Sequence, residues 1–215
     1  MQNNHIITIC GITKISITIY NPMICHEYKC IFIHVPKTAG TSIIKAFNLN
    51  WDHPDSKFLI TGNHSQNEEW EEYEQKYKDY FVFSIVRNPW ERFVSGWKYC
   101  ETTKHKNIED VLNNLPKATD HVHDYDHITK KQCDILYRNN ILIPNLLLRF
   151  ENLQSDFDKL CDILKKPKTK LPHLNKTSHD HYSCYFTPKI SKQLFEPKFH
   201  DDIHKLNYNH KKYYP

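Results

Sequence analysis

Runs of apolar residues alternate with segments of helical spacing along the chain. Buried strands are predicted where apolar residues follow one another, at residues 29–35, 80–86 and 146–150. Helices are predicted directly after these strands, at residues 41–47, 90–99 and 153–164. Strands that alternate with helices in this way indicate an α/β fold, in which helices flank a mostly parallel central sheet.

Weaker patterns predict three further elements in the first half of the chain. Residues 58–61 are a short strand candidate. Residues 67–78 are strongly charged and carry aromatic residues at helical spacing, which indicates a surface helix with one aromatic stripe. A helical patch covers residues 108–115, inside a polar stretch rich in His, Asp and Lys.

The C-terminal part is predicted to be a basic, proline-bounded loop at residues 165–172, followed later by a long helix. Thr187 provides a hydroxyl cap, and Pro188 suits the first helical position. The helix is expected to run to about Tyr208, with a kink or break at Pro197, because proline removes a backbone donor.

Length and composition favour one domain. The chain has 215 residues, of which 39% are hydrophobic, enough for one ordinary core. Residues 1–22 are interpreted as a strand or a loosely attached extension rather than a signal peptide, because they lack a basic lead-in and show strand-like alternation. The domain is expected at residues 23–215, with Met23 as a hypothetical functional start. Residues 102–131 are interpreted as an insertion or lid segment.

Charge and cysteine content limit the classes of partner. The formal net charge is +4, which favours an anionic ligand but is too small to indicate nucleic acid. No apolar run reaches the roughly 20 residues needed to cross a bilayer. The seven cysteines include no Cys-x-x-Cys pair, which argues against a zinc ribbon or a disulfide framework. A cytoplasmic or otherwise soluble protein with reduced thiols is expected.

The turn after the first predicted strand carries candidate chemistry. It reads Pro36, Lys37, Thr38, Ala39, Gly40, Thr41 and Ser42. A strand that feeds a turn and then a helix directs several backbone N–H groups at one place, which is the geometry of a phosphate or sulfate cradle. Gly40 allows close backbone approach, the hydroxyl groups add donors, and Lys37 adds a cation. The turn is predicted to hold an oxyanion in a P-loop-like strand–loop–helix.

A P-loop kinase or nucleotide triphosphatase is one alternative. Its loop ends in glycine, lysine and then serine or threonine, whereas here Lys37 precedes Gly40. We also find no convincing acidic residue at the end of an apolar strand to hold magnesium. Kinase chemistry is therefore the weaker interpretation.

Four segments carry a resemblance to one enzyme family. FIHVPKTAGTS resembles the 5′-phosphosulfate loop of sulfotransferases that use 3′-phosphoadenosine 5′-phosphosulfate (PAPS). FSIVRNPWERFVSGWKY resembles the 3′-phosphate segment of that family, and LLLRFENLQSDF and LPHLNKTSHDHYSCYFT resemble two later blocks. The subgroup that the chain resembles is the Golgi carbohydrate sulfotransferases acting on heparan, chondroitin and dermatan chains. Their membrane anchor and long stem have no counterpart in the pattern of this chain.

The resemblance implies a donor site with defined residues. PAPS would be the donor and 3′-phosphoadenosine 5′-phosphate (PAP) the product. The phosphosulfate would be bound by Lys37, Thr38, Ala39, Gly40, Thr41 and Ser42. Arg87 and Ser95 would clamp the 3′-phosphate, and guanidinium does bind phosphate through paired hydrogen bonds. Lys176 and Thr177 would add further contacts.

The resemblance also implies the catalytic groups. Lys37 would neutralise the leaving phosphate, and His64 would take the proton of the acceptor, because imidazole titrates near the operating pH. Glu68 is the reserve base. No metal is required for this reaction, and the acceptor would be a glycan or another hydroxyl-bearing molecule.

Two questions stay open at this level. A non-catalytic protein that binds PAPS or PAP would carry the same donor motifs. The run HVHDYDH at residues 121–127 superficially suggests a metal site, but acceptor recognition is the favoured interpretation for a polar segment near a cleft.

Overall fold

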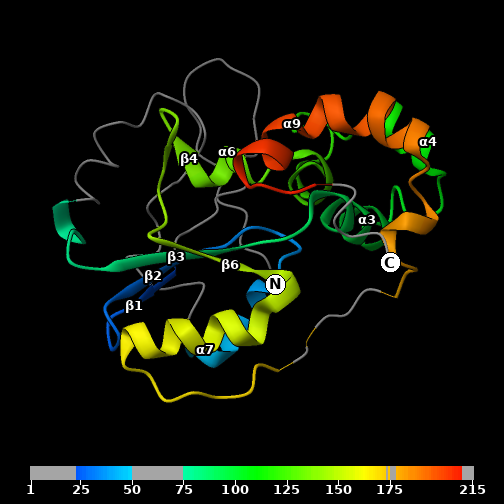
Figure 1. Ribbon diagram of the computed structural model, residues 1–215. Helices are drawn as coiled ribbons and strands as arrows, with labels where there is room; N and C mark the ends of the chain where they lie inside the picture. Colours follow the sequence, from blue (N-terminus) through cyan, green and yellow to red (C-terminus); the bar gives the residue numbers. More distant parts are fainter. Residues whose placement is uncertain (1–22, 50–74, 173, 175–177, 210–215) are drawn as a thin grey trace.

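The central feature of the computed structural model is a four-stranded sheet with the strand order β1-β2-β3-β6 (Figure 1). The structure describes residues 23–49, 75–172, 174 and 178–209. The strands are β1 (Met23–Cys25), β2 (Cys30–Ile33), β3 (Phe81–Val86) and β6 (Leu146–Arg149). Strands β2, β3 and β6 are parallel, and β1 pairs antiparallel with β2 at the edge. The predicted single-domain α/β fold with a mostly parallel sheet is therefore confirmed.

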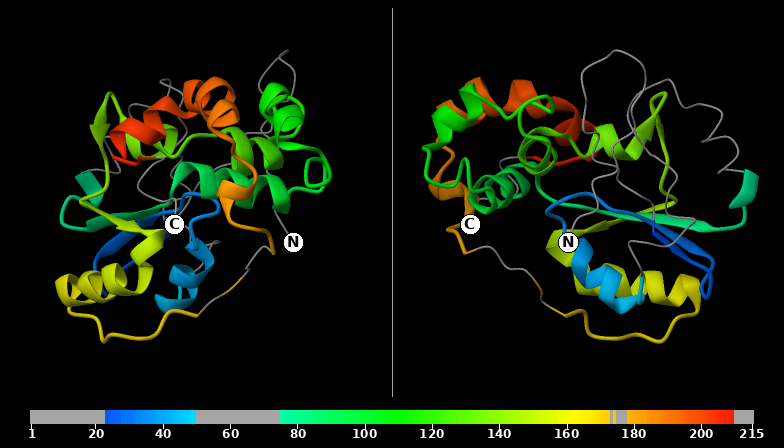
Figure 2. Two further views of the ribbon diagram at one scale, coloured as in Figure 1. Left: turned by 45° about the vertical axis from the view of Figure 1, so that its right-hand side comes forward. Right: turned by 180° about the vertical axis from the view of Figure 1, so that it is seen from behind.

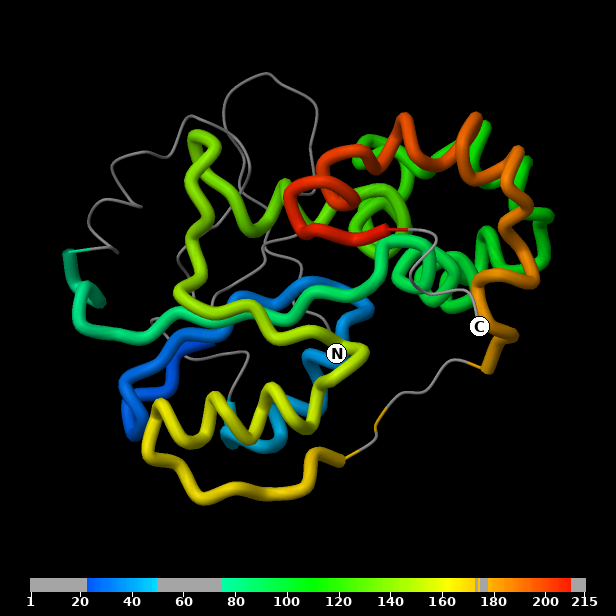
Figure 3. The backbone as a smooth tube through the Cα atoms, viewed as in Figure 1, coloured from blue at the N-terminus to red at the C-terminus, as the bar shows by residue number. Residues whose placement is uncertain are grey.

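The register brings the carboxyl ends of the parallel strands to one edge of the sheet. Ile33 of β2 lies opposite Ser84 of β3, and Val86 lies opposite Arg149 of β6. The hydroxyl of Ser84 donates a hydrogen bond to the Ile33 carbonyl at 2.6 Å. The turns that leave β2 and β3 thus begin side by side, as the backbone trace shows (Figure 3). Ligands of open α/β sheets bind at this kind of edge.

Helices α1 (Gly40–Ala46) and α7 (Leu153–Leu164) lie together against one face of the sheet, and the views in Figures 1 and 2 agree on this. Because strand side chains alternate between faces, every second residue of β2 and β3 points at these helices. Phe32 and Phe83 stack with their ring centroids 5.2 Å apart, and Phe157 of α7 is completely buried in the same cluster. This core fixes α1 behind the turn that precedes it.

A second core lies beyond the carboxyl edge of the sheet, where α3 (Pro89–Tyr99) packs with α9 (Glu196–Lys205). Phe93 of α3 makes edge-on contacts with Phe195 and Phe199. Trp90 is 1% exposed, and its indole N–H donates to the Ser191 hydroxyl at 2.9 Å. Trp90 is therefore a core residue, and it anchors α3 beside the sheet edge.

The remaining elements are short and connect these two cores. They are α4 (Ile108–Asn113), α5 (Val122–Asp124), the π-helical turn η2 (Tyr125–Thr129), α6 (Cys133–Leu136), β4 (Tyr137–Arg138), β5 (Ile141–Leu142), η3 (Phe150–Asn152), η4 (Tyr182–Cys184), α8 (Pro188–Ile190) and the π-helical turn η5 (Ser191–Phe195). Among the described helices, none combines the length and the apolar character that crossing a bilayer requires.

Several predicted elements differ from the structure. The C-terminal helix does not end at Pro197: the π-helical turn η5 runs directly into α9, and this proline takes one of the first positions of α9. The irregularities are instead the π-helical turn η5 and a kink at Phe199 (φ −114°, ψ 23°). Edge strand β1 was not predicted. The predicted strand at 58–61 and all but the end of the predicted helix at 67–78 lie outside the described residues.

Candidate active site

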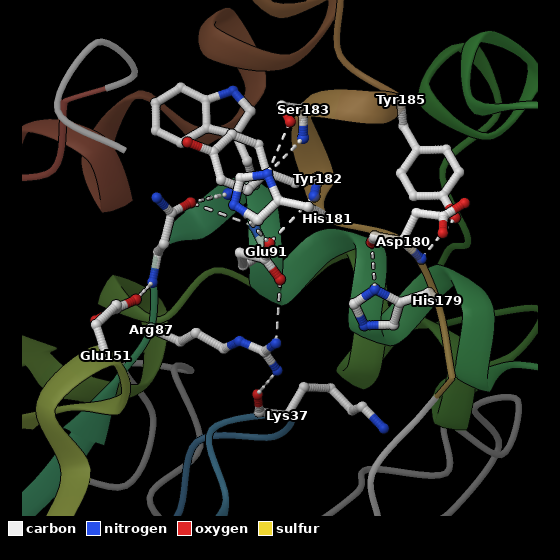
Figure 4. Close-up of polar contacts among 12 residues, drawn as sticks. Lys37, Arg87, Glu91, Glu151, His179, Asp180, His181, Tyr182, Ser183 and Tyr185 are labelled. Atoms are coloured by element: carbon white, nitrogen blue, oxygen red, sulfur yellow. Dashed lines mark hydrogen bonds and ion pairs between the residues drawn. The ribbon is translucent and has the colours of Figure 1, made fainter. Parts of the chain in front are cut away.

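The two turns with predicted anion-binding chemistry meet at the carboxyl edge of the sheet. The Arg87 guanidinium, at the end of β3, donates from Nη1 to the Lys37 carbonyl in the turn after β2 at 3.1 Å (Figure 4). Residues 50 positions apart are therefore in direct contact. Proximity of these turns is the minimum condition for one ligand to touch both, and the fold meets it.

The backbone of the first turn is strained in a way that favours an anion. Lys37 and Ala39 both have left-handed backbone conformations, with φ of 67° and 68°. This conformation costs a residue with a side chain roughly 1–2 kcal/mol. Turns that contain left-handed residues bring successive N–H groups together into an anion-binding concavity. Such strain is typical of a functional turn rather than a mere connection.

Hydroxyl groups in this turn have structural partners. Thr38 is fully buried and donates to the Val35 carbonyl at 2.7 Å. Ser42 donates to the Pro172 carbonyl at 2.7 Å, which ties α1 to a loop 130 residues away in sequence. Gly40 is required for close packing, because a Cβ atom there would lie 2.0 Å from the ring of His34. In the structure these side chains shape the turn, so donors to a ligand come first from its backbone.

The positive charge at the site comes mainly from side chains. Helix α1 has seven residues, so its dipole is a minor contribution. Lys37, Arg87 and Arg92 surround the turn instead. Arg92 was missed by sequence reasoning: it is 2% exposed and donates from Nε to the Pro36 carbonyl at 3.0 Å and from Nη2 to the Asp126 carbonyl at 3.4 Å. A buried guanidinium thus lies against the turn that is predicted to bind the anion.

The Lys37 side chain extends away from Arg87 (Figure 4) and rests on an aromatic ring. Its Nζ lies 3.6 Å from the centroid of the Tyr99 ring. Burial lowers the pKa of Lys37 to about 8, and the positive charges of Arg87 and Arg92 act in the same direction. Lys37 is therefore a cation whose charge is sensitive to pH just above neutrality.

Several groups hold Arg87 in place. Its backbone exchanges two hydrogen bonds with the side-chain amide of Gln132, at 3.0 and 2.8 Å. Its guanidinium lies 4.1 Å from the centroid of the Phe150 ring and pairs through Nη2 with Glu91 at 3.2 Å. Its Nε is buried and has no hydrogen-bond partner among the residues that the structure describes. A buried donor without a partner marks a place for a ligand acceptor.

Helix α3 starts with a dense polar network beside Arg87. The Asn88 side chain caps the helix by accepting from the N–H groups of Trp90 and Glu91. Glu151, which follows β6, accepts from the Asn88 N–H at 2.6 Å and from the Tyr208 hydroxyl at 3.1 Å. These bonds fix the direction in which Arg87 leaves the sheet.

The fourth sequence block also reaches the site. Glu91 accepts from the Tyr182 N–H at 3.1 Å and contacts His181 Nε2 at 3.5 Å (Figure 4). Ser95 lies farther along α3, is 4% exposed and leaves little of its surface open to solvent. His64, Glu68, Lys176 and Thr177 lie outside the described residues, and their predicted roles stay predictions.

One group of side chains near Lys37 resembles a metal-binding cluster. Potential ligand atoms of Cys100, His123 and Asp124 all lie within 4.8 Å of one another. Hydrogen bonds already account for this arrangement, because Asp124 accepts from Thr102 and contacts His123 Nδ1 at 3.0 Å. We therefore give the cluster an orienting role rather than a metal.

Fold and site together define an α/β protein with cationic side chains gathered at the carboxyl edge of its parallel strands, the edge where ligands of open α/β sheets bind. A family model described as the sulfotransferase family matches residues 20–214, so the chain belongs to the sulfotransferase family and is an enzyme of sulfuryl transfer. No curated protein and no solved structure shows significant similarity to the chain.

Proposed function

We propose that this sulfotransferase transfers the sulfuryl group of PAPS to a hydroxyl group of a carbohydrate. The observation that carries the proposal is the contact between Arg87 and the Lys37 carbonyl, which joins the two turns that the donor's 3′-phosphate and phosphosulfate would need. Membership of the family and the resemblance of both turns to its donor-binding segments support the same assignment.

The donor site follows from the two turns. The backbone N–H groups of residues 37–42 receive the phosphosulfate, with Lys37 near its bridging oxygen. Arg87 binds the 3′-phosphate through Nε, which has no other described partner, and one remaining N–H of the guanidinium. Ser95 completes this contact from α3. Arg87 keeps its hydrogen bond to the Lys37 carbonyl at the same time, so one connected set of groups binds both the 3′-phosphate and the phosphosulfate.

The reaction needs positioning, charge neutralisation and one proton acceptor. Lys37 stabilises the charge that grows on the leaving phosphate as the sulfur–oxygen bond to that phosphate breaks. The acceptor oxygen forms the new bond to sulfur and gives up its proton to His64. The products are PAP and a sulfate ester, and the base carries the proton.

A transfer assay tests this proposal. Labelled sulfate from PAPS is expected to appear on one of a panel of glycans, and Lys37→Ala and His64→Ala should each lower turnover by roughly two to four orders of magnitude. Lys189→Ala, on the exposed start of α8, is the matched control and should transfer normally. PAP binding without transfer to any acceptor would instead indicate a non-catalytic nucleotide-binding protein.

A further inference from the structure

An exposed aromatic ring adjoins the proposed catalytic lysine. Tyr99, the last residue of α3, is 47% exposed, although one side of its ring is covered by the Lys37 ammonium group at 3.6 Å. Tyrosine combines a large apolar ring with a polar hydroxyl group and is enriched at binding interfaces. Tyr99 is therefore a candidate for contact with a ligand beside Lys37.

Two imidazole rings extend the surface of Tyr99, and we call Tyr99, His123 and His127 the ring platform. The Tyr99 centroid lies 5.6 Å from that of His123 and 5.2 Å from that of His127, with interplanar angles of 33° and 34°. The two imidazoles are stacked, with centroids 4.3 Å apart and planes 28° apart. The two imidazoles stack on each other and both lie tilted against the Tyr99 ring, so the ring platform is a compact cluster of three rings beside Lys37.

Contacts within the protein orient the two imidazole rings. His123 Nδ1 contacts the Asp124 carboxylate at 3.0 Å, and Asp124, which is 5% exposed, is itself held by Thr102. His127 Nδ1 lies 2.7 Å from the His123 carbonyl. Because both Nδ1 atoms are engaged within the protein, hydrogen bonding to a ligand falls to the two Nε2 atoms. The platform thus offers an aromatic face together with polar edges.

We propose that the ring platform binds a pyranose ring of the acceptor glycan, and that Lys37 and this sugar occupy the exposed face of Tyr99 in turn. The inference rests on the proposed function and deepens it. A pyranose has a flat C–H face for the aromatic ring and hydroxyl groups around its edge for the imidazoles, which matches the mixed chemistry of the platform. The acceptor is thereby held next to Lys37.

The position of Lys37 sets the order of binding. An ammonium group on an exposed aromatic ring gains only about 0.5–1 kcal/mol. The phosphosulfate group offers full negative charges in a partly buried turn, where electrostatic attraction is stronger. Bound PAPS or PAP therefore attracts the Lys37 ammonium group away from the Tyr99 ring, and the sugar then occupies the uncovered face of that ring. Glycan affinity should accordingly be higher when the nucleotide site is occupied.

Calorimetric titration tests this inference with two oligosaccharides of equal length, one desulfated and rich in uronic acid and one of neutral β-linked glucose. Each is titrated with and without saturating PAP, in the presence of a chelator. With PAP bound, at least one of the two oligosaccharides should bind to the wild type, and Tyr99→Ala should lower the affinity for that oligosaccharide about tenfold. Tyr99→Phe should stay within about twofold, because the ring is kept.

Matched controls separate the platform from general effects. Tyr28→Ala removes another tyrosine that lies under a lysine, with Lys166 Nζ 5.6 Å from its ring, in the β1–β2 turn at the opposite end of β2. It should bind glycan like the wild type. In Lys37→Ala the face of Tyr99 is uncovered, so glycan should bind without PAP as tightly as it binds the PAP-loaded wild type.

The outcomes are distinguishable. Three results would overturn the inference. They are wild-type glycan affinity in Tyr99→Ala, glycan affinity that is the same with and without PAP, and no binding of either oligosaccharide. PAP affinity is measured in the same titrations; it should rise by at most about fivefold in Tyr99→Ala, where the Lys37 ammonium group has no ring contact to give up, and stay unchanged in Tyr99→Phe. Absence of PAP binding in the wild type contradicts the proposed function itself, whereas normal PAP binding with a Tyr99-independent glycan contradicts only the platform.

Discussion

Lys37 combines a strained backbone, a side chain that lies on the Tyr99 ring and a lowered pKa. Its carbonyl binds Arg87, its φ is 67°, and its ammonium group lies on Tyr99. The backbone of this residue builds the turn, and its side chain supplies a cation to the proposed donor site.

The lowered pKa of Lys37 predicts a pH dependence of donor binding. With a pKa of about 8, Lys37 is charged below that pH and loses its proton above it. PAP affinity should be constant near neutrality and fall by up to about tenfold per pH unit above the pKa, because the bound nucleotide favours the charged form. Calorimetry across this pH range measures the effect.

Lys37→Arg is the control, because guanidinium stays charged throughout that range. The inflection should disappear in this variant even if the affinity at neutral pH is lower. The same inflection in both proteins would show that another group titrates.

Individual residues at the site differed in how far sequence alone could place them. Lys37 and Arg87 stand out because their motifs are local, one in a turn and one at the end of an apolar strand. Arg92 could not be predicted as buried, since it lies on the face of α3 opposite to Trp90 and Phe93. Its burial depends on η2, which folds over that face from a later part of the chain.

At the scale of elements, the packing of η2 on α3 decides the shape of the site. Gly96 allows this packing: a Cβ atom there would lie 2.1 Å from the His127 carbonyl oxygen. Arg92, Gly96 and Tyr99 follow one another along the same face of α3, at helical spacing. The face that binds η2 is therefore also the face that carries the ring platform and the buried arginine.

Gly96→Ala should push η2 away from α3. The contact is with backbone, which cannot turn aside as a side chain does, so the free energy of unfolding should fall by roughly 1–3 kcal/mol. Denaturant unfolding measures this loss. Asn113→Ala, at an exposed position of α4, is the control and should change stability by less than about 0.5 kcal/mol. Equal stability of Gly96→Ala and the wild type would contradict the close packing described here.

The long elements were predictable because their patterns are strong and local. β3, α3, β6 and α7 match their predicted ranges closely, since uninterrupted apolar runs and an amphipathic helix leave few alternatives. β1 and the β4–β5 hairpin were missed because each is at most three residues long and is defined by its pairing partner. The kink at Phe199 was not predicted at that residue; it follows the π-helical turn η5, which no local pattern shows.

At the scale of the whole molecule, two histidines link stability to pH. Burial lowers the pKa of His34 and of His127 to about 4, with positive charge from Arg92 adding to both effects. At a pH between about 4 and 6.5, each histidine is neutral in the folded protein and protonated in the unfolded chain. Their contribution is complete above about pH 6.5, the unfolded value, and is lost as pH falls toward the folded value.

The wild type should therefore lose stability between about pH 6.5 and 4, by up to roughly 3 kcal/mol for each histidine. His127→Gln should reduce the slope of unfolding free energy against pH by about one proton in this interval and leave the curve above it parallel to the wild type. Denaturant unfolding at a series of pH values measures this slope for both proteins. An unchanged slope would mean that His127 is not held neutral.

The central claim is that the turns after β2 and β3 hold one nucleotide with phosphates at both its 3′ and 5′ positions. Calorimetric comparison of PAP with 5′-AMP, for the wild type and Arg87→Ala, tests it most directly. The wild type should prefer PAP by about tenfold or more, and Arg87→Ala should weaken PAP by roughly 1.5–3 kcal/mol while leaving 5′-AMP nearly unchanged. Equal affinity of the wild type for both nucleotides, or an equal loss for both in Arg87→Ala, would contradict the account.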